Sequence, residues 1–303
     1  MSEASWSNYW QGREGDKTGA LTGIESDQEL QTHWAGILSD GPRDAPFLDL
    51  ACGAGTLLKQ AQGMGYTNLT GLDISSEAVS VLASTIPTVK TVIASAAKTE
   101  LPDEAFAMIV SQFGVEYAEA EAGLIEAARL CREGGHIETV MHMAGGAIEA
   151  EVKEHEAHCK SLLASGFIEQ AKAFFHAAYS GSTEDIKRLS NDLVTARKQV
   201  STLVKPGQRS LAAHLIAGTA QLWDKRTAYA GEDVTAWLEG MKTEIKAYQS
   251  RMESMIAAAL TKADLSRCIS ALKDRDFTVR AGPLKLSGAD AAWALSALKK
   301  ISS

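Results

Sequence analysis

Short apolar runs alternate with helix-like stretches between Pro46 and Val140, and this alternation predicts a parallel sheet joined by crossover helices. The runs read PFLDLA, NLTGLDI, TVIAS, AMIVSQF and HIETVMH. Between them, GTLLKQAQGMG has helical spacing and SSEAVSVLAST opens with a serine cap. EAEAGLIEAARLCREGG reads as a helix that ends at a Gly-Gly stop. Five β-α units in this order predict a doubly wound α/β sheet.

The pattern changes from Gly145 to Ala263, where good helix formers follow one another without a convincing strand. This stretch predicts a helical insertion. Its last helix carries an apolar stripe with spacings of four and three, formed by Trp237, Met241, Ile245, Tyr248, Met252, Met255 and Ala259. The stripe fits packing against neighbouring helices, a lid over a ligand cleft, or the contact of a homodimer.

The chain returns to the sheet after this insertion. LSRCISALKDRDF reads as a capped helix, and FTVRAGPLKLSG and AAWALSALKK read as a pair of strands. We therefore expect an N-terminal helical, aromatic-rich segment over 1–45, one α/β domain built from 46–144 and 264–303, and the helical insertion over 145–263. The domain should hold a mostly parallel seven-stranded sheet.

Composition and charge narrow the classes of function. The 303 residues are 45% hydrophobic and 22% charged, which is ordinary for a folded soluble protein. The net charge of -8 argues against a broad basic surface, so a nucleic-acid partner is not expected. The N-terminus lacks a signal pattern and no stretch is apolar enough for a membrane span, so we expect no membrane partner and a cytoplasmic location. Four widely separated cysteines form no disulfide or zinc framework: Cys52, Cys131, Cys159 and Cys268.

The stretch LDLACGAGTLL is the strongest candidate for a binding site. It predicts a strand ending at Asp49 to Ala51, a turn containing Gly53 and Gly55, and a helix starting at Thr56. Glycines at such a turn let the backbone approach a ligand closely. A dinucleotide site would have a third glycine where this chain has Leu58. The sequence therefore favours a nucleoside ligand over a dinucleotide.

Two acidic residues indicate the charge of that ligand. Asp49 directly precedes the turn, where a carboxylate would repel a pyrophosphate and suit a cation. Asp73 follows at the end of the next strand, in GLDIS, where a carboxylate can accept hydrogen bonds from both ribose hydroxyls. A ligand with a ribose, a positive charge and no phosphate fits this pair, and S-adenosylmethionine meets that description.

These stretches resemble the class I S-adenosylmethionine-dependent methyltransferases, a superfamily with a Rossmann-like fold. LDLACGAGTLL resembles their first motif, GLDIS their second and RLCREGGHIETVMH their fifth-strand region, while IVSQFGVEYA is similar to the fourth-strand motif of members that act on small molecules. The resemblance covers residues 46–143 and the C-terminal strand pair more loosely. It implies an enzyme with S-adenosylmethionine as its cofactor.

The resemblance also implies roles for individual residues. The methionyl part and ribose of the cofactor would face Asp49, Ala51, Gly53 and Gly55. Asp73 would bind the ribose hydroxyls, Ile74 would pack against the adenine, and Ser111 with Gln112 would lie near the methionine end. The superfamily usually has an acidic residue for the adenine amino group after the third strand. This chain has Ser95 and Ala96 there, so the serine hydroxyl or a backbone carbonyl would replace the carboxylate.

Methyl transfer from a sulfonium is a direct displacement, so the enzyme mainly aligns the acceptor and excludes water. A hydroxyl or ammonium acceptor also needs a base. His142, at the end of the fifth predicted strand, is the first candidate, although a histidine there can also be purely structural. Glu116 and Tyr117, just past the fourth strand, are the second candidates for catalysis or for shaping the pocket.

Two other groups of residues have ambiguous patterns. The aromatic residues Trp6, Tyr9, Trp10 and Trp34 can pack on the core or cover a ligand. Glu151, His155 and Cys159 share one helix face, with His158 beside them, at a spacing that can hold a metal. Helices rich in Glu and Lys show such spacings by chance, so we expect no metal site.

The leading hypothesis is methyl transfer from S-adenosylmethionine to a small-molecule acceptor. Three alternatives stay open: a macromolecular acceptor, a protein that binds the cofactor without turnover, and transfer of another group of the cofactor, such as aminopropyl. The insertion would act as a lid or a dimer contact.

Overall fold

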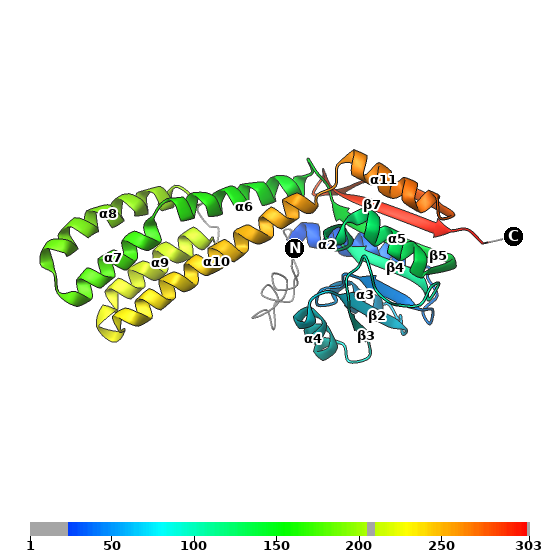
Figure 1. Ribbon diagram of the computed structural model, residues 1–303, viewed down its shortest axis with the longest axis horizontal. Helices are drawn as coiled ribbons and strands as arrows, with labels where there is room; N and C mark the ends of the chain where they lie inside the picture. The colour runs from blue at the N-terminus through cyan, green and yellow to red at the C-terminus, as the bar shows by residue number, and fades with distance from the viewer. Residues whose placement is uncertain (1–23, 205–209, 302–303) are drawn as a thin grey trace. The chain divides into compact units, whose positions relative to one another are not determined.

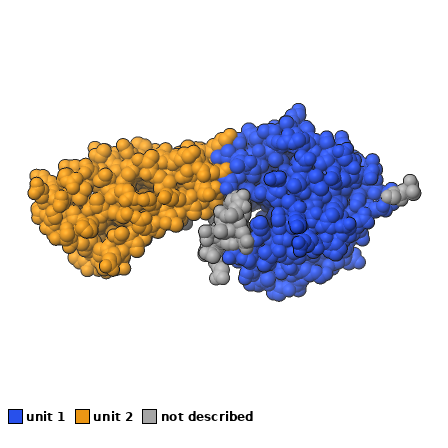
Figure 2. Space-filling view, viewed as in Figure 1, with its two compact units in different colours: residues 1–151, 254–303 blue, residues 152–253 orange. Residues whose placement is uncertain are grey.

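The computed structural model describes residues 24–204 and 210–301, and within them the chain divides into two compact units. Unit 2 is the continuous stretch Val152–Glu253, and unit 1 combines the chain up to Glu151 with the chain from Ser254 onward (Figure 2). The expected insertion over 145–263 therefore extends beyond unit 2 at both ends. This difference arises because the helices at the two borders, α6 and α10, run from one unit into the other.

Unit 1 contains a seven-stranded sheet with the order β3-β2-β1-β4-β5-β7-β6 (Figure 1). The five strands β1 to β5 are parallel, and β7 is antiparallel to both β5 and β6. The strands are β1 (Phe47–Leu50), β2 (Leu69–Asp73), β3 (Lys90–Ile93), β4 (Phe106–Gln112), β5 (Cys131–His142), β6 (Phe277–Leu286) and β7 (Ala289–Lys299). The predicted doubly wound sheet with a returning C-terminal strand pair is confirmed.

Two helices of unit 1, α4 and α11, begin at residues whose side chains cap them. Ser75 accepts a hydrogen bond from the Ala78 amide, and Thr261 forms a capping box with Asp264. The helices are α2 (Ile24–Leu38), α3 (Thr56–Gly63), α4 (Ser76–Thr85), the 3-10 turn η1 (Val115–Ala118), α5 (Ala120–Leu130) and α11 (Lys262–Lys273). None of the helices in the described ranges is long and apolar enough to cross a membrane.

The end of α5 corrects one sequence prediction. The expected Gly-Gly stop is wrong, because α5 already ends at Leu130 and CREGG forms the start of β5. The pairing of β5 with β4 shifts register here, from Phe106↔Cys131 to Met108↔His136. Gly134 has a φ of 67°, and a Cβ on Gly135 would lie 2.8 Å from the Arg132 carbonyl oxygen. The two glycines therefore permit a bulge in the strand.

The two faces of the sheet carry different helices. Helices α5 and α11 pack together on one face, where Leu124 and Leu272 join Ile109, Ile137 and Leu295 in the main hydrophobic core. Side chains alternate along each strand, so every second residue of these strands points to the opposite face of the sheet. Helix α2 lies on that face and contacts α3 and β6.

Unit 2 is helical throughout its described residues. Its helices are the main part of α6 (Ala147–Ala164), α7 (Phe167–Ser180), α8 (Thr183–Ser201), α9 (Leu211–Asp224) and most of α10 (Gly231–Ala258), with the 3-10 turn η2 (Arg226–Ala228). Met241 and Ile245 of the predicted apolar stripe are buried in the core of this unit. The Trp237 ring lies against α9, where a Cβ on Gly218 would approach it to 2.4 Å. This part of the stripe therefore packs against neighbouring helices, while Ala259 lies just past the end of α10.

Candidate active site

The candidate site lies where strand order reverses. In the sheet, β1 pairs with β2 on one side and with β4 on the other, so the chain continues outward on opposite sides of β1. Crevices at the carboxyl ends of such strands are the usual ligand sites of doubly wound sheets. The predicted cofactor residues and the candidate catalytic residues all follow β1, β2, β3, β4 or β5, or stand in their last positions.

The turn after β1 needs unusual backbone geometry. Ala51, Gly53 and Gly55 have φ values of 62°, 52° and 82°, all in the left-handed region. A side chain at Gly55 would also place its Cβ 2.4 Å from Leu82 Cδ1 on α4. Glycine at position 55 therefore permits both the turn and the close packing of α3 against α4.

Asp73 fixes this turn to the end of β2. Its Oδ2 accepts a hydrogen bond from the Gly53 amide at 2.8 Å, and its Oδ1 accepts one from the Ser75 amide at 2.9 Å. Burial raises the pKa of this carboxyl, and the amides of Ser75, Gly53 and Ile74 partly offset that rise. The Ile74 side chain is 37% exposed beside it, an open apolar surface that could meet a planar ring.

Asp49 is a second buried carboxyl next to the first. It is 2% exposed within β1, and burial, together with the neighbouring charge of Asp73, raises its pKa to about 8. Neither carboxyl forms an ion pair with a basic side chain in the described part of the chain. Because the folded-state pKa exceeds the unfolded one, Asp49 lowers stability progressively as the pH rises from about 4 to about 8. Ionising Asp49 in this site therefore costs folding free energy, and a cationic ligand would offset that cost.

The predicted residues at the end of β4 make mainly protein contacts. The Ser111 hydroxyl donates to the Leu50 carbonyl at 2.7 Å and accepts from the Val115 amide at 3.0 Å. Gln112 Oε1 accepts a hydrogen bond from Trp34 Nε1 at 2.6 Å. Ser111 thus joins β4 to β1 and η1, and Trp34, which is fully buried, orients Gln112.

The segment after β3 holds the residues expected near the adenine. The Ser95 hydroxyl accepts from the Ala97 amide at 3.3 Å, and Ala96 is buried in the main core. This segment is anchored to α5, since Glu126 Oε1 accepts hydrogen bonds from the amide and hydroxyl of Thr99 at 2.8 and 2.6 Å. Hydrogen bonds from Arg129 hold the pKa of Glu126 at about 2, so this anchor is ionised at neutral pH.

The structure brings His142 and Glu116 into contact. Glu116 Oε1 lies 2.6 Å from His142 Nδ1 and also accepts a hydrogen bond from the His142 amide at 2.9 Å. Their side chains are 3% and 0% exposed. A carboxylate at this position accepts a hydrogen bond from Nδ1–H, so a neutral imidazole would carry its lone pair on Nε2.

Two aromatic rings flank this imidazole. The Phe113 and Tyr117 ring centroids lie 4.5 and 5.8 Å from that of His142. Phe113 has a φ of 51°, a conformation that is uncommon for a bulky residue. His142 Nε2 is buried and has no hydrogen-bond partner among the described residues. A buried nitrogen without a protein partner is the arrangement expected of an atom that forms its hydrogen bond with the substrate.

The remaining candidates are the N-terminal aromatic residues and the possible metal ligands of α6. Trp6, Tyr9 and Trp10 lie outside the described residues, so their expected roles remain predictions. His155 Nδ1 lies 3.0 Å from the Tyr248 hydroxyl. A search of the described residues finds no group of three His, Cys, Asp or Glu side chains placed to hold a metal.

The comparison with protein families now identifies the domain. Residues 47–135 match the family described as "Methyltransferase domain". This match and the sheet topology support the class I S-adenosylmethionine-dependent methyltransferase superfamily for the α/β part of unit 1. The match supports an enzyme of this kind, with S-adenosylmethionine as its cofactor.

Solved structures show more distant similarity. An S-adenosylmethionine-dependent methyltransferase from Mesorhizobium loti is 22% identical, with a TM-score of 0.33, and the match covers 37% of this chain and 53% of that one. The YcgJ protein from Bacillus subtilis is 14% identical, with a TM-score of 0.39 and coverage of 89% and 100%. Phosphoethanolamine N-methyltransferase 1 from Haemonchus contortus is 14% identical, with a TM-score of 0.38 and coverage of 48% and 34%. The match thus spans about half the length of the Mesorhizobium loti protein. No curated protein matches the chain.

Proposed function

We propose that the protein transfers the methyl group of S-adenosylmethionine to a small-molecule acceptor. The observation that carries this proposal is the pair of buried carboxyls, Asp49 and Asp73, beside a glycine turn at the point where strand order reverses. Two carboxyls without a basic partner in the described residues suit a ribose diol and a cation, and disfavour a pyrophosphate. The residues present therefore fit the cofactor of the superfamily.

Individual residues take distinct parts in this proposal. Asp49, Ala51, Gly53 and Gly55 would bind the methionyl part and ribose. Asp73 would accept from the ribose hydroxyls, and the exposed Ile74 side chain would pack against the adenine. Ser95, Ala96, Ser111 and Gln112 would complete the site, with Ser111 acting through the position of the β4 end. The bound cofactor supplies the methyl group, on a sulfonium that makes it susceptible to displacement.

The protein would supply the proton acceptor. Glu116 orients the His142 imidazole through Nδ1, and Nε2 would take the proton of a hydroxyl or ammonium acceptor. Phe113 and Tyr117 surround the ring and would keep water away from it. This arrangement favours turnover over binding alone.

Glu116 also borders a cavity whose lining does not include His142 or the proposed cofactor residues. A cavity of about 520 Å³ in unit 1 is lined by Glu116, Tyr117 and residues of α5, α11 and the end of α10. This size is in the range of small-molecule sites. The lining also includes Glu119, Glu121 and Asp264, against the single arginine Arg267. Such a surface would repel the phosphates of a nucleic acid.

Calorimetric titration of purified, cofactor-stripped protein tests the proposal. We expect micromolar binding of S-adenosylmethionine and S-adenosylhomocysteine, and no binding of NAD, because Asp49 would repel its pyrophosphate. A screen of small hydroxyl and amine compounds for S-adenosylhomocysteine release then tests turnover. Absence of binding by both cofactor forms would overturn the proposal, and binding without product from any acceptor class would favour a cofactor-binding protein.

The ionisation of Asp49 makes a separate prediction about pH. A cationic ligand favours the carboxylate, so cofactor binding should release protons and become several-fold tighter between pH 6 and pH 8, as the carboxyl with its pKa of about 8 ionises. Titration in two buffers of different ionisation enthalpy measures this release. The Asp49→Asn variant should bind more weakly at pH 8, without that pH dependence, and should be more stable than the wild type in the absence of ligand. A wild-type affinity that does not change with pH would contradict this role of Asp49.

A further inference from the structure

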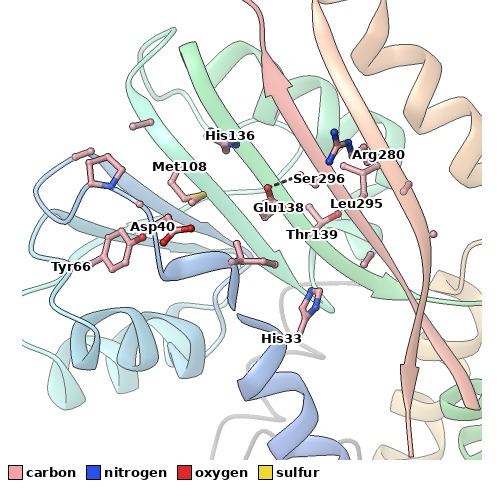
Figure 3. Close-up of a pocket in the computed structure, with 18 residues that line it drawn as sticks. His33, Asp40, Tyr66, Met108, His136, Glu138, Thr139, Arg280, Leu295 and Ser296 are labelled. Carbon is pink, nitrogen blue, oxygen red and sulfur yellow. Dashed lines mark hydrogen bonds between the residues drawn. The ribbon is translucent and has the colours of Figure 1, made fainter. Parts of the chain in front are cut away.

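A second cavity lies on the opposite face of the sheet from α5 and α11. It has a volume of about 610 Å³, and its lining comes from α2, the residues before β1, and the strands β4 to β7. None of the predicted cofactor or catalytic residues lines it. The strand positions involved, Ala107 and Met108 in β4 and His136 and Glu138 in β5, precede the carboxyl ends where the candidate active site lies (Figure 3). This cavity is therefore distinct from the methyl-transfer site.

One row of side chains crosses the floor of this cavity. Glu138 pairs with Ser296 across β5 and β7, and Ser296 pairs with Arg280 across β7 and β6. Paired residues of neighbouring strands point to the same face, so Ser296 stands between the carboxyl and the guanidinium. Its hydroxyl donates to Glu138 Oε1 at 2.7 Å. Figure 3 marks this hydrogen bond with a dashed line. No ion pair joins Glu138 and Arg280 in the described chain.

Glu138 is a buried carboxyl that the protein only partly satisfies. It is 8% exposed, and Ser296 is its only hydrogen-bond partner within the described ranges. Burial raises its pKa to about 7, and the Ser296 hydrogen bond opposes this rise. An acidic group held in this way weakens the folded state as the pH rises from about 4.5 to about 7, because the unfolded chain releases its proton more readily. A carboxyl of this kind beside a cavity needs an explanation.

The walls define the chemistry of a ligand that would pair with Glu138. They are largely apolar, with Ile37, Met108, Ala294 and the Tyr66 ring among them. The other polar residues of the lining are His33 on α2, Asp40 before β1, His136 and Thr139 on β5 and Arg280 on β6, besides the Tyr66 hydroxyl. Burial lowers the pKa of His33, so its imidazole is neutral at pH 7. His136, Asp40 and Arg280 are exposed, so Glu138 is the buried acidic group that a ligand inside the cavity would meet.

We propose that this cavity is a second binding site, which takes a small organic amine with its ammonium group on Glu138 and its apolar body between α2 and the sheet. A charge-assisted hydrogen bond to the second carboxyl oxygen would complete the partners of Glu138. Ser296 would keep the carboxyl pointing along the floor of the cavity. A volume of about 610 Å³ has room for an aromatic or branched aliphatic amine.

The site is also connected to the candidate active site through α2. His33 lines the cavity, and the next residue, Trp34, donates to Gln112 Oε1 at the end of β4. A ligand that contacts His33 would therefore touch the helix that orients Gln112.

The test uses two primary amines, benzylamine and 4-phenylbutylamine, with benzyl alcohol and 4-phenylbutanol as neutral counterparts. Titrations of the full chain are followed by calorimetry and by amide NMR signals of Gly282, Ala294 and Ser296, which lie on the cavity floor. We expect at least one amine to bind with shifts at these signals, at least tenfold tighter than its alcohol, with release of protons at pH 6.5. Saturating S-adenosylhomocysteine should not displace it.

Two variants decide whether Glu138 recognises the amine. Glu138→Gln should lower the affinity at least tenfold, and should melt at a higher temperature than the wild type at pH 8 because the buried charge is gone. Arg280→Gln is the matched charge-removal control on the same row and should not weaken amine binding, because it removes a positive charge and leaves the acceptor in place. Equal binding of amines and alcohols, an affinity unaffected by Glu138→Gln, loss of binding in Arg280→Gln, or absence of shifts at the cavity signals would each overturn the proposal.

Discussion

Replacing His142 by Asn is expected to lower kcat by roughly 10² to 10⁴-fold while the affinity for S-adenosylmethionine stays within about twofold of the wild type. The expected loss is large because Nε2 is the buried, unpartnered nitrogen that would accept the proton of the acceptor. Asn keeps a donor near Glu116, so the buried carboxylate retains a partner. Turnover with the acceptor found by screening, measured beside cofactor titrations, separates the two effects.

A second substitution tests the role of Glu116 in the same pair. In Glu116→Gln the amide oxygen can still accept from the His142 amide and from Nδ1–H, but a neutral amide stabilises the imidazolium formed during proton transfer less than a carboxylate does. Turnover should therefore fall although His142 is still present, and the slope of kcat against pH should change. Wild-type turnover in His142→Asn would reduce the pair to a structural contact between β5 and η1.

Replacing Asp73 by Ala is expected to weaken S-adenosylmethionine binding by about 1 to 3 kcal/mol, which is roughly 5- to 150-fold. Two effects add: the ribose hydroxyls lose their acceptors, and the Gly53 and Ser75 amides lose theirs. Calorimetry at pH 8 measures the affinity change directly.

Asp73→Asn is the matched control for this prediction. Its side-chain oxygen can still accept from one of the two amides, so the glycine turn should be better preserved than in Asp73→Ala. The affinity should lie between those of the wild type and the alanine variant. Unchanged affinity in Asp73→Ala would show that the ribose is held elsewhere.

The sequence predicted the sheet because each strand of unit 1 is a short apolar run between turn or cap residues. The same pattern placed Asp49, Asp73 and His142 at strand ends, and parallel strands bring those ends to one edge. The roles of these residues stay predictions. The contact between Glu116 and His142 spans 26 positions and depends on the pairing of β4 with β5, so spacing alone did not show it.

Two features were missed for physical reasons. Gly134 and Gly135 read as a helix stop because positive φ serves both helix ends and strand bulges, and the sequence does not separate the two uses. Glu138 was passed over as part of an apolar run. The alternation of His136 and Glu138 with the core residues Ile137 and Met141 indicates that both polar side chains point away from the core. That Glu138 borders a cavity depends on β6 and β7, which come from far along the chain.

The position of β7 between β5 and β6 has a consequence for biosynthesis. This interior strand is made after β6 and after all of unit 2. At about 5 to 20 residues per second, β5 waits roughly 8 to 30 s for its antiparallel neighbour. During that interval the nascent sheet has a bare edge at β5, and unit 2 has time to fold first. A chain whose synthesis stops within β6 or β7 would therefore have the glycine turn after β1, but its sheet would end at an unpaired β5 edge that is prone to aggregation.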